Sequence, residues 1–205
     1  MPSIDRDGLL ERFLRYVKID TQANPDTDAY PSSAGQWELG KLLVEELLAL
    51  GFSDARQDDH ALVLATIPGN AEGPPIVFNA HLDTSPECPG ANVRPQVIRR
   101  YGGGDIRLPG DTSQVIRTEE SPELNDLIGC TLVTTDGTTL LGADDKAGVA
   151  VIMHFAETLA ANPQLPHGDL RILFTCDEEL GRGVNHVDVP GLNAVVGYTL
   201  DGPGA

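Results

Sequence analysis

Three short apolar segments are each followed at once by residues that bind metal ions or carry protons, and this repeated arrangement most constrains the fold. The segments and the residues after them are 76–80 before His81-Leu82-Asp83, 170–175 before Cys176-Asp177-Glu178-Glu179, and 194–200 before Asp201-Gly202. Short apolar runs bounded by turn residues indicate buried β-strands. Because ligand-binding residues of α/β proteins gather beyond the carboxyl ends of the strands, we expect these side chains to meet at one edge of a sheet.

Amphipathic periodicity predicts the helices that would cover this sheet. Apolar residues at helical spacing predict helices over residues 4–18 and 146–161, and a third helix that begins at Ser33 and ends at Gly51. Gln36 follows Ser33 by three positions, which is the spacing of a capping box, and glycine suits the position after a helix. Since helices alternate with apolar strands, the predicted fold class is α/β, with a three-layer mixed sheet.

A long segment without clear periodicity interrupts this pattern. Residues 85–129 are rich in proline and glycine, with small strands such as 96–100 expected inside them. A loop of this length is usually functional or forms a small subdomain. After it, residues 131–135 and 138–141 are predicted to pair as a hairpin around the turn Asp136-Gly137.

The strongly acidic composition argues against several classes of partner. The 205 residues include 14 Lys and Arg against 31 Asp and Glu, which gives a net charge of −17. Such a charge repels phosphate backbones and anionic lipids, so we expect neither nucleic acid nor a membrane as a partner. No apolar stretch is long enough to span a membrane, and the polar N-terminus lacks a secretory signal. Three cysteines without metal-site spacing favour a reducing compartment, and we therefore expect a cytoplasmic protein.

One imidazole among several carboxylates is typical of a divalent-metal site of the zinc, manganese or cobalt type. A further acidic pair, Asp144-Asp145, stands just before the predicted helix at 146. So many anions at one edge would repel one another unless cations neutralised them, and two metal ions about 3.5–4 Å apart suit amide hydrolysis. In the doublet Glu178-Glu179, one carboxylate can bind metal while the other acts as a general base.

Simpler structural roles compete with these functional ones. His81 taken alone is compatible with a hydrogen-bonded histidine at a strand end, and Glu178 with a solvated surface charge. Asp83 is compatible with a cap, and Asp145 either caps the following helix or serves the site. The remaining histidines are interpreted as structural: His60, His154, His167 and His186.

Four ordered motifs resemble the di-zinc exopeptidase superfamily. They are His81-Leu82-Asp83-Thr84, the segment 142–148 (GADDKAG), the segment 177–181 (DEELG) and the segment 198–202 (YTLDG). Four further segments resemble the tripeptide aminopeptidase branch of that superfamily, namely 92–96, 101–106, 134–137 and 166–169. The resemblance covers almost the whole chain and implies a zinc-exopeptidase-like catalytic domain.

Carried over residue by residue, the resemblance implies a two-zinc site. His81 and Asp201 would bind the first zinc ion, Asp144 would bridge the two ions, and Glu179 would bind the second. The resemblance also implies a cis peptide bond between Asp144 and Asp145.

Two further roles are implied for acidic residues beside the metals. Glu178 would be the general base, and Asp83 would orient the His81 imidazole without binding a metal ion itself. The implied activity is that of a zinc-dependent aminopeptidase, which cleaves the N-terminal residue from tripeptides with metal-activated water. A small peptide would therefore be the substrate.

Members of this superfamily are about twice as long as this sequence. The resemblance implies that residues 1–205 form the N-terminal portion of the catalytic domain, and that the lid and dimerisation domain and the C-terminal catalytic segment lie outside it. A later histidine that completes the second zinc site would lie there too, together with the contacts of a homodimer. Two alternatives stay open: a metal-binding chain that is inactive alone, and a related N-acyl amino acid amidohydrolase.

Overall fold

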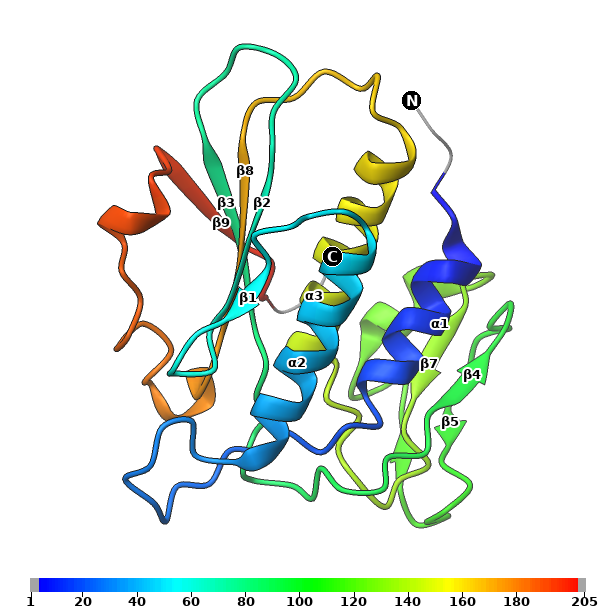
Figure 1. The fold of residues 1–205 in the computed structure, drawn as a ribbon. Coiled ribbons are helices and arrows are strands. Elements are labelled where there is room, and N and C mark those ends of the chain that lie inside the picture. Colours follow the sequence, from blue (N-terminus) through cyan, green and yellow to red (C-terminus); the bar gives the residue numbers. More distant parts are fainter. Residues whose placement is uncertain (1–3, 203–205) are drawn as a thin grey trace.

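A five-stranded mixed sheet forms the centre of the structure, a computed structural model that describes residues 4–202 (Figure 1). In spatial order its strands are β1 (Arg56–Gln57), β2 (Val63–Ile67), β8 (Leu170–Thr175), β3 (Ile76–His81) and β9 (Val196–Thr199). β3 runs parallel to β8 and β9, whereas β2 runs antiparallel to β1 and β8. The predicted α/β class with a mixed sheet is confirmed, and the carboxyl ends of three strands share one edge.

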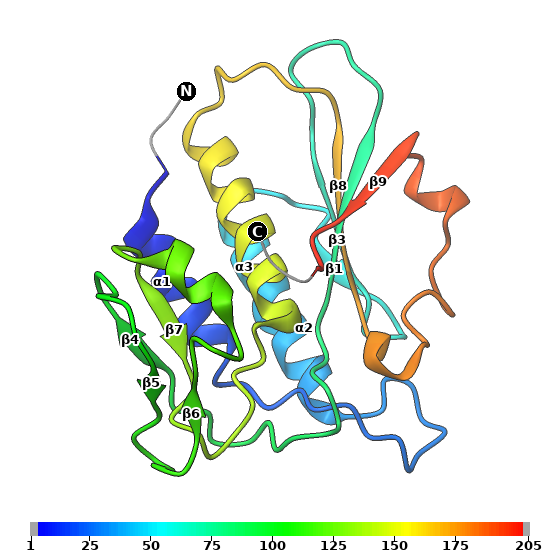
Figure 2. The same cartoon turned by 180° about the vertical axis from the view of Figure 1, so that it is seen from behind.

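Three helices lie on one side of this sheet: α1 (Arg6–Tyr16), α2 (Ala34–Ala49) and α3 (Ala143–Ala161). α2 packs over β1 and β2, α3 packs over β3, and α1 lies against α3 on the side away from the sheet (Figures 1 and 2). Alternate strand residues meet the helices in one continuous core, which includes Val63, Phe174, Leu43 and Met153. In the described residues the opposite face of the sheet carries the irregular segment 176–195, which includes two short 3₁₀ helices, η2 (Glu178–Leu180) and η3 (Pro190–Leu192).

The predicted helices are confirmed, with one correction at the start of α2. Ser33 is the N-cap as predicted, and Gly51 follows the helix with a φ of +96°. The predicted capping box is wrong, because the Ser33 side chain makes no cap hydrogen bond. The Gln36 side chain points into the interior, where its amide group contacts Asp177 and its Nε2 also donates to the Ser33 hydroxyl at 3.2 Å.

The long excursion forms a small subdomain with its own core. Its elements are β4 (Gln96–Ile98), β5 (Ile106–Arg107), β6 (Val115–Ile116) and η1 (Pro122–Leu127), joined by β7 (Leu132–Thr134). β4 pairs with β7 and β5 pairs with β6, both antiparallel. Tyr101, Ile106, Leu108 and Leu124 are buried together between them.

The hairpin predicted over residues 131–141 is wrong. β7 pairs with β4 rather than with residues 138–141, which are not a strand. The reason lies at Asp136, whose carbonyl oxygen accepts hydrogen bonds from the Gly110 and Asp111 amides. Its carboxylate accepts from the amide and hydroxyl of Thr138, so the chain turns toward the 110–111 loop and not back along β7.

Within residues 4–202, we find no helix with the length and apolar character required to cross a membrane. The chain end at Ala205, after which the superfamily's lid was expected, lies outside the described residues.

Candidate metal centre

The predicted site residues lie together at the carboxyl edge of the sheet. His81 is the last residue of β3, and Asp201 lies two residues after β9. Glu178 and Glu179 form the start of η2, which follows β8, and Asp144 stands at the start of α3. Parallel pairing of β3 with both β8 and β9 brings these distant parts of the sequence to one place.

The Nε2 atom of His81 faces three carboxylates. It lies 2.9 Å from Asp144 Oδ1, 3.9 Å from Glu178 Oε2 and 4.0 Å from Asp201 Oδ2. The ligand atoms of His81, Asp144 and Asp201 all lie within 4.8 Å of one another. Ligands held about 2.0–2.2 Å from a tetrahedral zinc ion are separated by roughly 3.4 Å, so this donor set fits a divalent cation with small adjustments.

Asp83 holds both His81 and the glutamate pair. Its carboxylate is fully buried, and Oδ1 lies 3.3 Å from Nδ1 of His81. The two carboxylate oxygens also accept hydrogen bonds from the backbone amides of Glu178 and Glu179, each at 3.0 Å. One buried side chain therefore lies where it can orient the imidazole and the turn that carries two candidate site residues.

Acidic neighbours control the protonation of His81. Burial lowers its pKa, but the contact with Asp83 and the negative charges of Asp83 and Asp145 outweigh burial and raise the pKa to about 10. The imidazole consequently holds a proton at neutral pH when no cation is bound. Burial acts in the opposite sense on the neighbouring carboxyl and raises the pKa of Asp145 to about 7.

Glu179 lies beside the three-donor group and does not belong to it. It shares a cleft of about 440 Å³ with Asp144, Ser85 and the loop 140–143. Burial and then the negative charge of Asp144 raise the pKa of Glu179. The described residues thus supply one complete three-donor group, with Glu179 next to the carboxylate that was expected to bridge.

Asp145 combines the two roles that the sequence left open. Its Oδ1 accepts from the Gly148 amide, which caps the helix, and its Oδ2 accepts from the His81 amide, both at 3.1 Å. The peptide bond between Asp144 and Asp145 is cis, as the resemblance implied. Lys146, for which the sequence pattern indicated no role, is buried and donates a 2.7 Å hydrogen bond to the Ile19 carbonyl oxygen.

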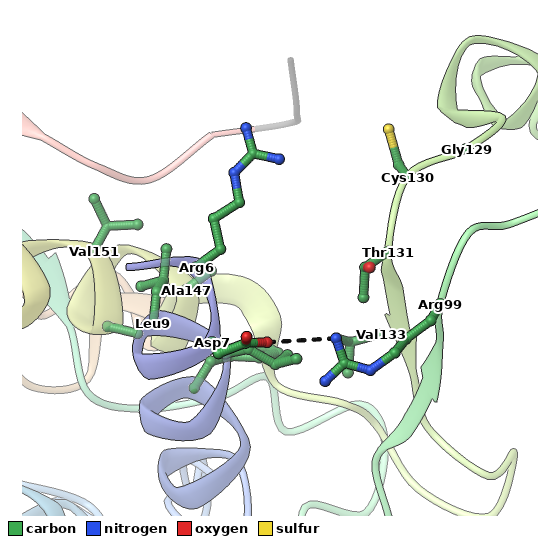
Figure 3. Close-up of a pocket in the computed structure, with 13 residues that line it drawn as sticks. Arg6, Asp7, Leu9, Arg99, Gly129, Cys130, Thr131, Val133, Ala147 and Val151 are labelled. Atoms are coloured by element: carbon green, nitrogen blue, oxygen red, sulfur yellow. Dashed lines mark hydrogen bonds and ion pairs between the residues drawn. The ribbon is translucent and has the colours of Figure 1, made fainter. Parts of the chain in front are cut away.

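Two other features lie apart from this cluster. His186 stacks on His60 with ring centroids 3.9 Å apart, consistent with the structural interpretation of both residues. A cleft of about 530 Å³ between α1 and β7 is lined mainly by apolar residues and crossed by an ion pair of 3.4 Å between Asp7 and Arg99 (Figure 3). None of the predicted site residues lines that cleft.

Comparison with known proteins shows which proteins the chain resembles. The family described as Peptidase family M20/M25/M40 matches residues 132–204. Over 199 residues, the sequence is 50% identical to proteins named Peptidase T from Geobacillus thermodenitrificans and from Geobacillus kaustophilus. The chain is related to peptidase T. Each match covers 96% of the chain but 48% of the relative, so the chain spans about half the length of these peptidase T proteins and corresponds to their N-terminal half.

Solved structures show the same relationship in the fold. A tripeptidase from Staphylococcus aureus has a TM-score of 0.70 at 24% identity, and it matches 99% of this chain and 45% of its own length. The aminopeptidase PepT from Bacillus cereus has a TM-score of 0.69 at 26% identity, and it matches 98% of this chain and 44% of its own.

Proposed function

We propose that this chain is part of a zinc-dependent aminopeptidase that removes the N-terminal residue from tripeptides. The observation that carries this proposal is that Nε2 of His81 faces carboxylates which come from the ends of β8 and β9 and from the start of α3. The similarity to proteins named Peptidase T and to the aminopeptidase PepT supports an aminopeptidase activity.

Three residues would hold the first cation: His81, Asp144 and Asp201. Asp144 would also serve a second cation, for which Glu179 lies in the adjacent cleft. A divalent cation bound here supplies electrophilic activation of a peptide carbonyl and lowers the pKa of a nearby water molecule.

Glu178 would move the proton in this reaction. Half of its side chain is exposed, and its carboxylate lies 3.9 Å from Nε2 of His81, so it borders the donor group without being enclosed by it. A carboxylate in this place can take a proton from water and deliver it to the departing amine. Asp83 would keep this base in position through the hydrogen bond from the Glu178 amide.

A second candidate function is that of a metal-binding chain with no hydrolytic activity of its own. The described residues contain one three-donor group, whereas Asp144 and Glu179 alone are available for a second cation. We propose, from the match to half of each relative, that residues 1–205 are part of a larger catalytic domain with 85–129 as an excursion. The remaining histidine of the second site and the contacts of a homodimer would then come from the other part.

We also propose that the protein works in the cytoplasm on small peptides. Cys88, Cys130 and Cys176 are all free thiols, which suits a reducing compartment. The net charge of −17 is unfavourable for nucleic acids and anionic membranes as partners.

The first test is the zinc content of purified protein, measured by elemental analysis after exchange into buffer with trace zinc. One or two zinc ions per chain support the metal centre, and none in a folded chain overturns it. Hydrolysis of a tripeptide supports the aminopeptidase, whereas bound zinc without hydrolysis supports the inactive metal-binding chain.

The base is tested separately with Glu178→Gln, in a form of the protein that hydrolyses tripeptides. We expect unchanged zinc content and a kcat lower by about 10²–10⁴-fold, since the side chain loses its basic oxygen. The exposed control Glu87→Gln should keep full activity. Near-normal turnover of Glu178→Gln would refute this assignment.

A further inference from the structure

The turn that carries Glu178 and Glu179 is anchored by the residue before them. Asp177 has a left-handed backbone with a φ of 56°, a conformation that is uncommon outside glycine and that redirects the chain after β8. Its amide donates to Oε1 of Gln36 at 3.0 Å. Its carbonyl oxygen accepts from the amides of Leu180 at 3.3 Å and of Arg182 at 2.9 Å, which closes the turn.

The carboxylate of Asp177 is fully buried and, among residues 4–202, it is held by hydrogen bonds without an ion pair. It accepts from the amide of Ser32 at 2.8 Å, from the hydroxyl of Ser32 at 2.5 Å and from Nε2 of Gln36 at 2.7 Å. A buried carboxylate is tolerated only when such donors replace its hydration. Asp177 is therefore fixed by residues about 140 positions earlier in the sequence.

Gln36 makes the double contact that fixes this geometry. Its side chain is fully buried, and its single amide group both donates to the Asp177 carboxylate and accepts from the Asp177 amide. A glutamate at this position suits a capping box as well as a glutamine does, but it would bring a second carboxylate against Asp177. Glutamine supplies the acceptor and the donor together, so the residue type matches this contact.

Two buried carboxylates thus hold the glutamate turn from two directions. The Asp83 carboxylate accepts hydrogen bonds from the amides of Glu178 and Glu179, and Asp177 joins the start of the same turn to α2. We propose that Gln36 is a positioning residue for the Glu178–Glu179 pair and that it acts through Asp177. Its consequence for catalysis rests on the proposed function, whereas the positioning itself does not.

Hydrogen exchange tests the positioning without relying on activity. Gln36→Met keeps the length of the side chain and removes both contacts with Asp177, together with the hydrogen bonds from Nε2 to the hydroxyls of Ser33 at 3.2 Å and Ser32 at 3.5 Å. The matched control is Gln57→Met, because the half-buried Gln57 side chain also makes two hydrogen bonds near α2, to the carbonyl oxygens of Trp37 and Ala61. Exchange rates of backbone amides are measured residue by residue in the wild type and in both variants.

We expect the amides of Glu178 and Glu179 to exchange about ten- to a hundred-fold faster in Gln36→Met, the factor that corresponds to losing hydrogen bonds to a charged group. Both amides should keep their wild-type rates in Gln57→Met, and the amides of β8 should keep theirs in both variants. Unchanged exchange at the glutamates, or an equal acceleration throughout the protein, would overturn the proposal.

A reciprocal exchange of donor and acceptor provides the rescue test. Gln36→Glu alone should disturb the turn as much as Gln36→Met does. The double variant Gln36→Glu with Asp177→Asn restores one donor and one acceptor across the same contact, and it should recover slow exchange at the two glutamate amides. If Gln36→Met does not fold, this pair still decides the question, because a double variant no better than Gln36→Glu would refute the pairing.

Kinetics separate this proposal from the proposed function. In a form of the protein that hydrolyses tripeptides, Gln36→Met should lower kcat by at least about tenfold with little change in KM, because the glutamates remain but are less well placed. Absence of hydrolysis in the wild type would contradict the proposed function, while the exchange rates would still decide whether Gln36 positions the turn. Fast exchange with unchanged kcat would refute the catalytic consequence.

Discussion

Arg12 joins the three helices, and its replacement should cost far more stability than that of its exposed neighbour Arg15. Its guanidinium contacts Glu46 of α2, donates to Glu157 of α3 at 3.0 Å and donates to the hydroxyl of Tyr16 at 3.0 Å. The Arg12 side chain is 10% exposed, compared with 50% for Arg15, which pairs with the same Glu46 at 2.5 Å. Arg12→Met therefore removes a largely buried charge that three partners share.

The expected loss follows from the burial of those partners. Removal of one member of a buried ion pair costs about 3–5 kcal/mol, and an exposed pair contributes about 0–1 kcal/mol. Glu157 is 45% exposed. After the substitution, Glu46 still accepts the hydrogen bond from the Tyr16 hydroxyl and still pairs with Arg15. We therefore expect Arg12→Met to lower the free energy of unfolding by about 2–3 kcal/mol and Arg15→Met to lower it by less than about 1 kcal/mol.

Urea denaturation followed by circular dichroism measures both losses. In about 1 M NaCl the screening length falls to about 3 Å, so the effect of Arg15→Met should nearly disappear while most of the Arg12→Met effect persists. Equal losses for the two variants, or an Arg12→Met effect abolished by salt, would refute the reasoning from burial.

Three other outcomes follow from the described contacts. Hydrogen bonds from the hydroxyl and amide of Thr138 lower the pKa of Asp136. The ionised Asp136 carboxylate therefore stabilises the fold above a pH near 3.8, and this stabilisation is lost as the pH falls through the pKa of Asp136 in the folded protein. In an NMR titration, Thr138→Val should move that pKa back up. Cys176 is fully buried and its pKa is raised by burial, so a thiol reagent should modify the two exposed cysteines in the native state and Cys176 only after unfolding. Zinc at a hundred times its Kd should raise the free energy of unfolding by about 2.7 kcal/mol. Asp201→Asn should largely abolish this increase, whereas the exposed control Asp188→Asn should keep it. Equal stabilisation of both variants would count against the metal centre.

The sequence was most informative where local pattern and burial point to the same answer. The bounds of β3, β8 and β9 were predicted within a residue or two, because each strand is an apolar run bounded by turn residues. Once these strands run parallel in one sheet, their carboxyl ends lie at the same edge, so the proximity of His81 to Asp201 follows from the topology. The distances around Nε2 of His81 depend on side-chain packing and had to come from the structure.

The failures occurred where a short-range signal competes with a long-range contact. Asp136-Gly137 has a strong hairpin signal, yet the hydrogen bonds from Gly110 and Asp111 redirect the chain. The spacing of Ser33 and Gln36 predicts a capping box, but Gln36 forms hydrogen bonds with a buried carboxylate instead. In both places the residue that determines the local conformation lies far away in the sequence, so the neighbouring residues alone cannot predict that conformation.

The charge distribution at the sheet edge gives cation binding a physical reason in this chain. Asp83, Asp144, Glu178 and Asp201 each have a carboxylate oxygen within 4.0 Å of the His81 ring nitrogens, so one imidazolium faces four acidic groups. The nearby ammonium group of Lys146 donates its hydrogen bond to a backbone carbonyl and, among the described residues, makes no ion pair within 4.0 Å. Protonation of His81 therefore neutralises only part of the local charge. A divalent cation would replace one proton by two positive charges and reduce the repulsion among the carboxylates. In the presence of the cation, variants of these residues that bind it more weakly should therefore also be less stable.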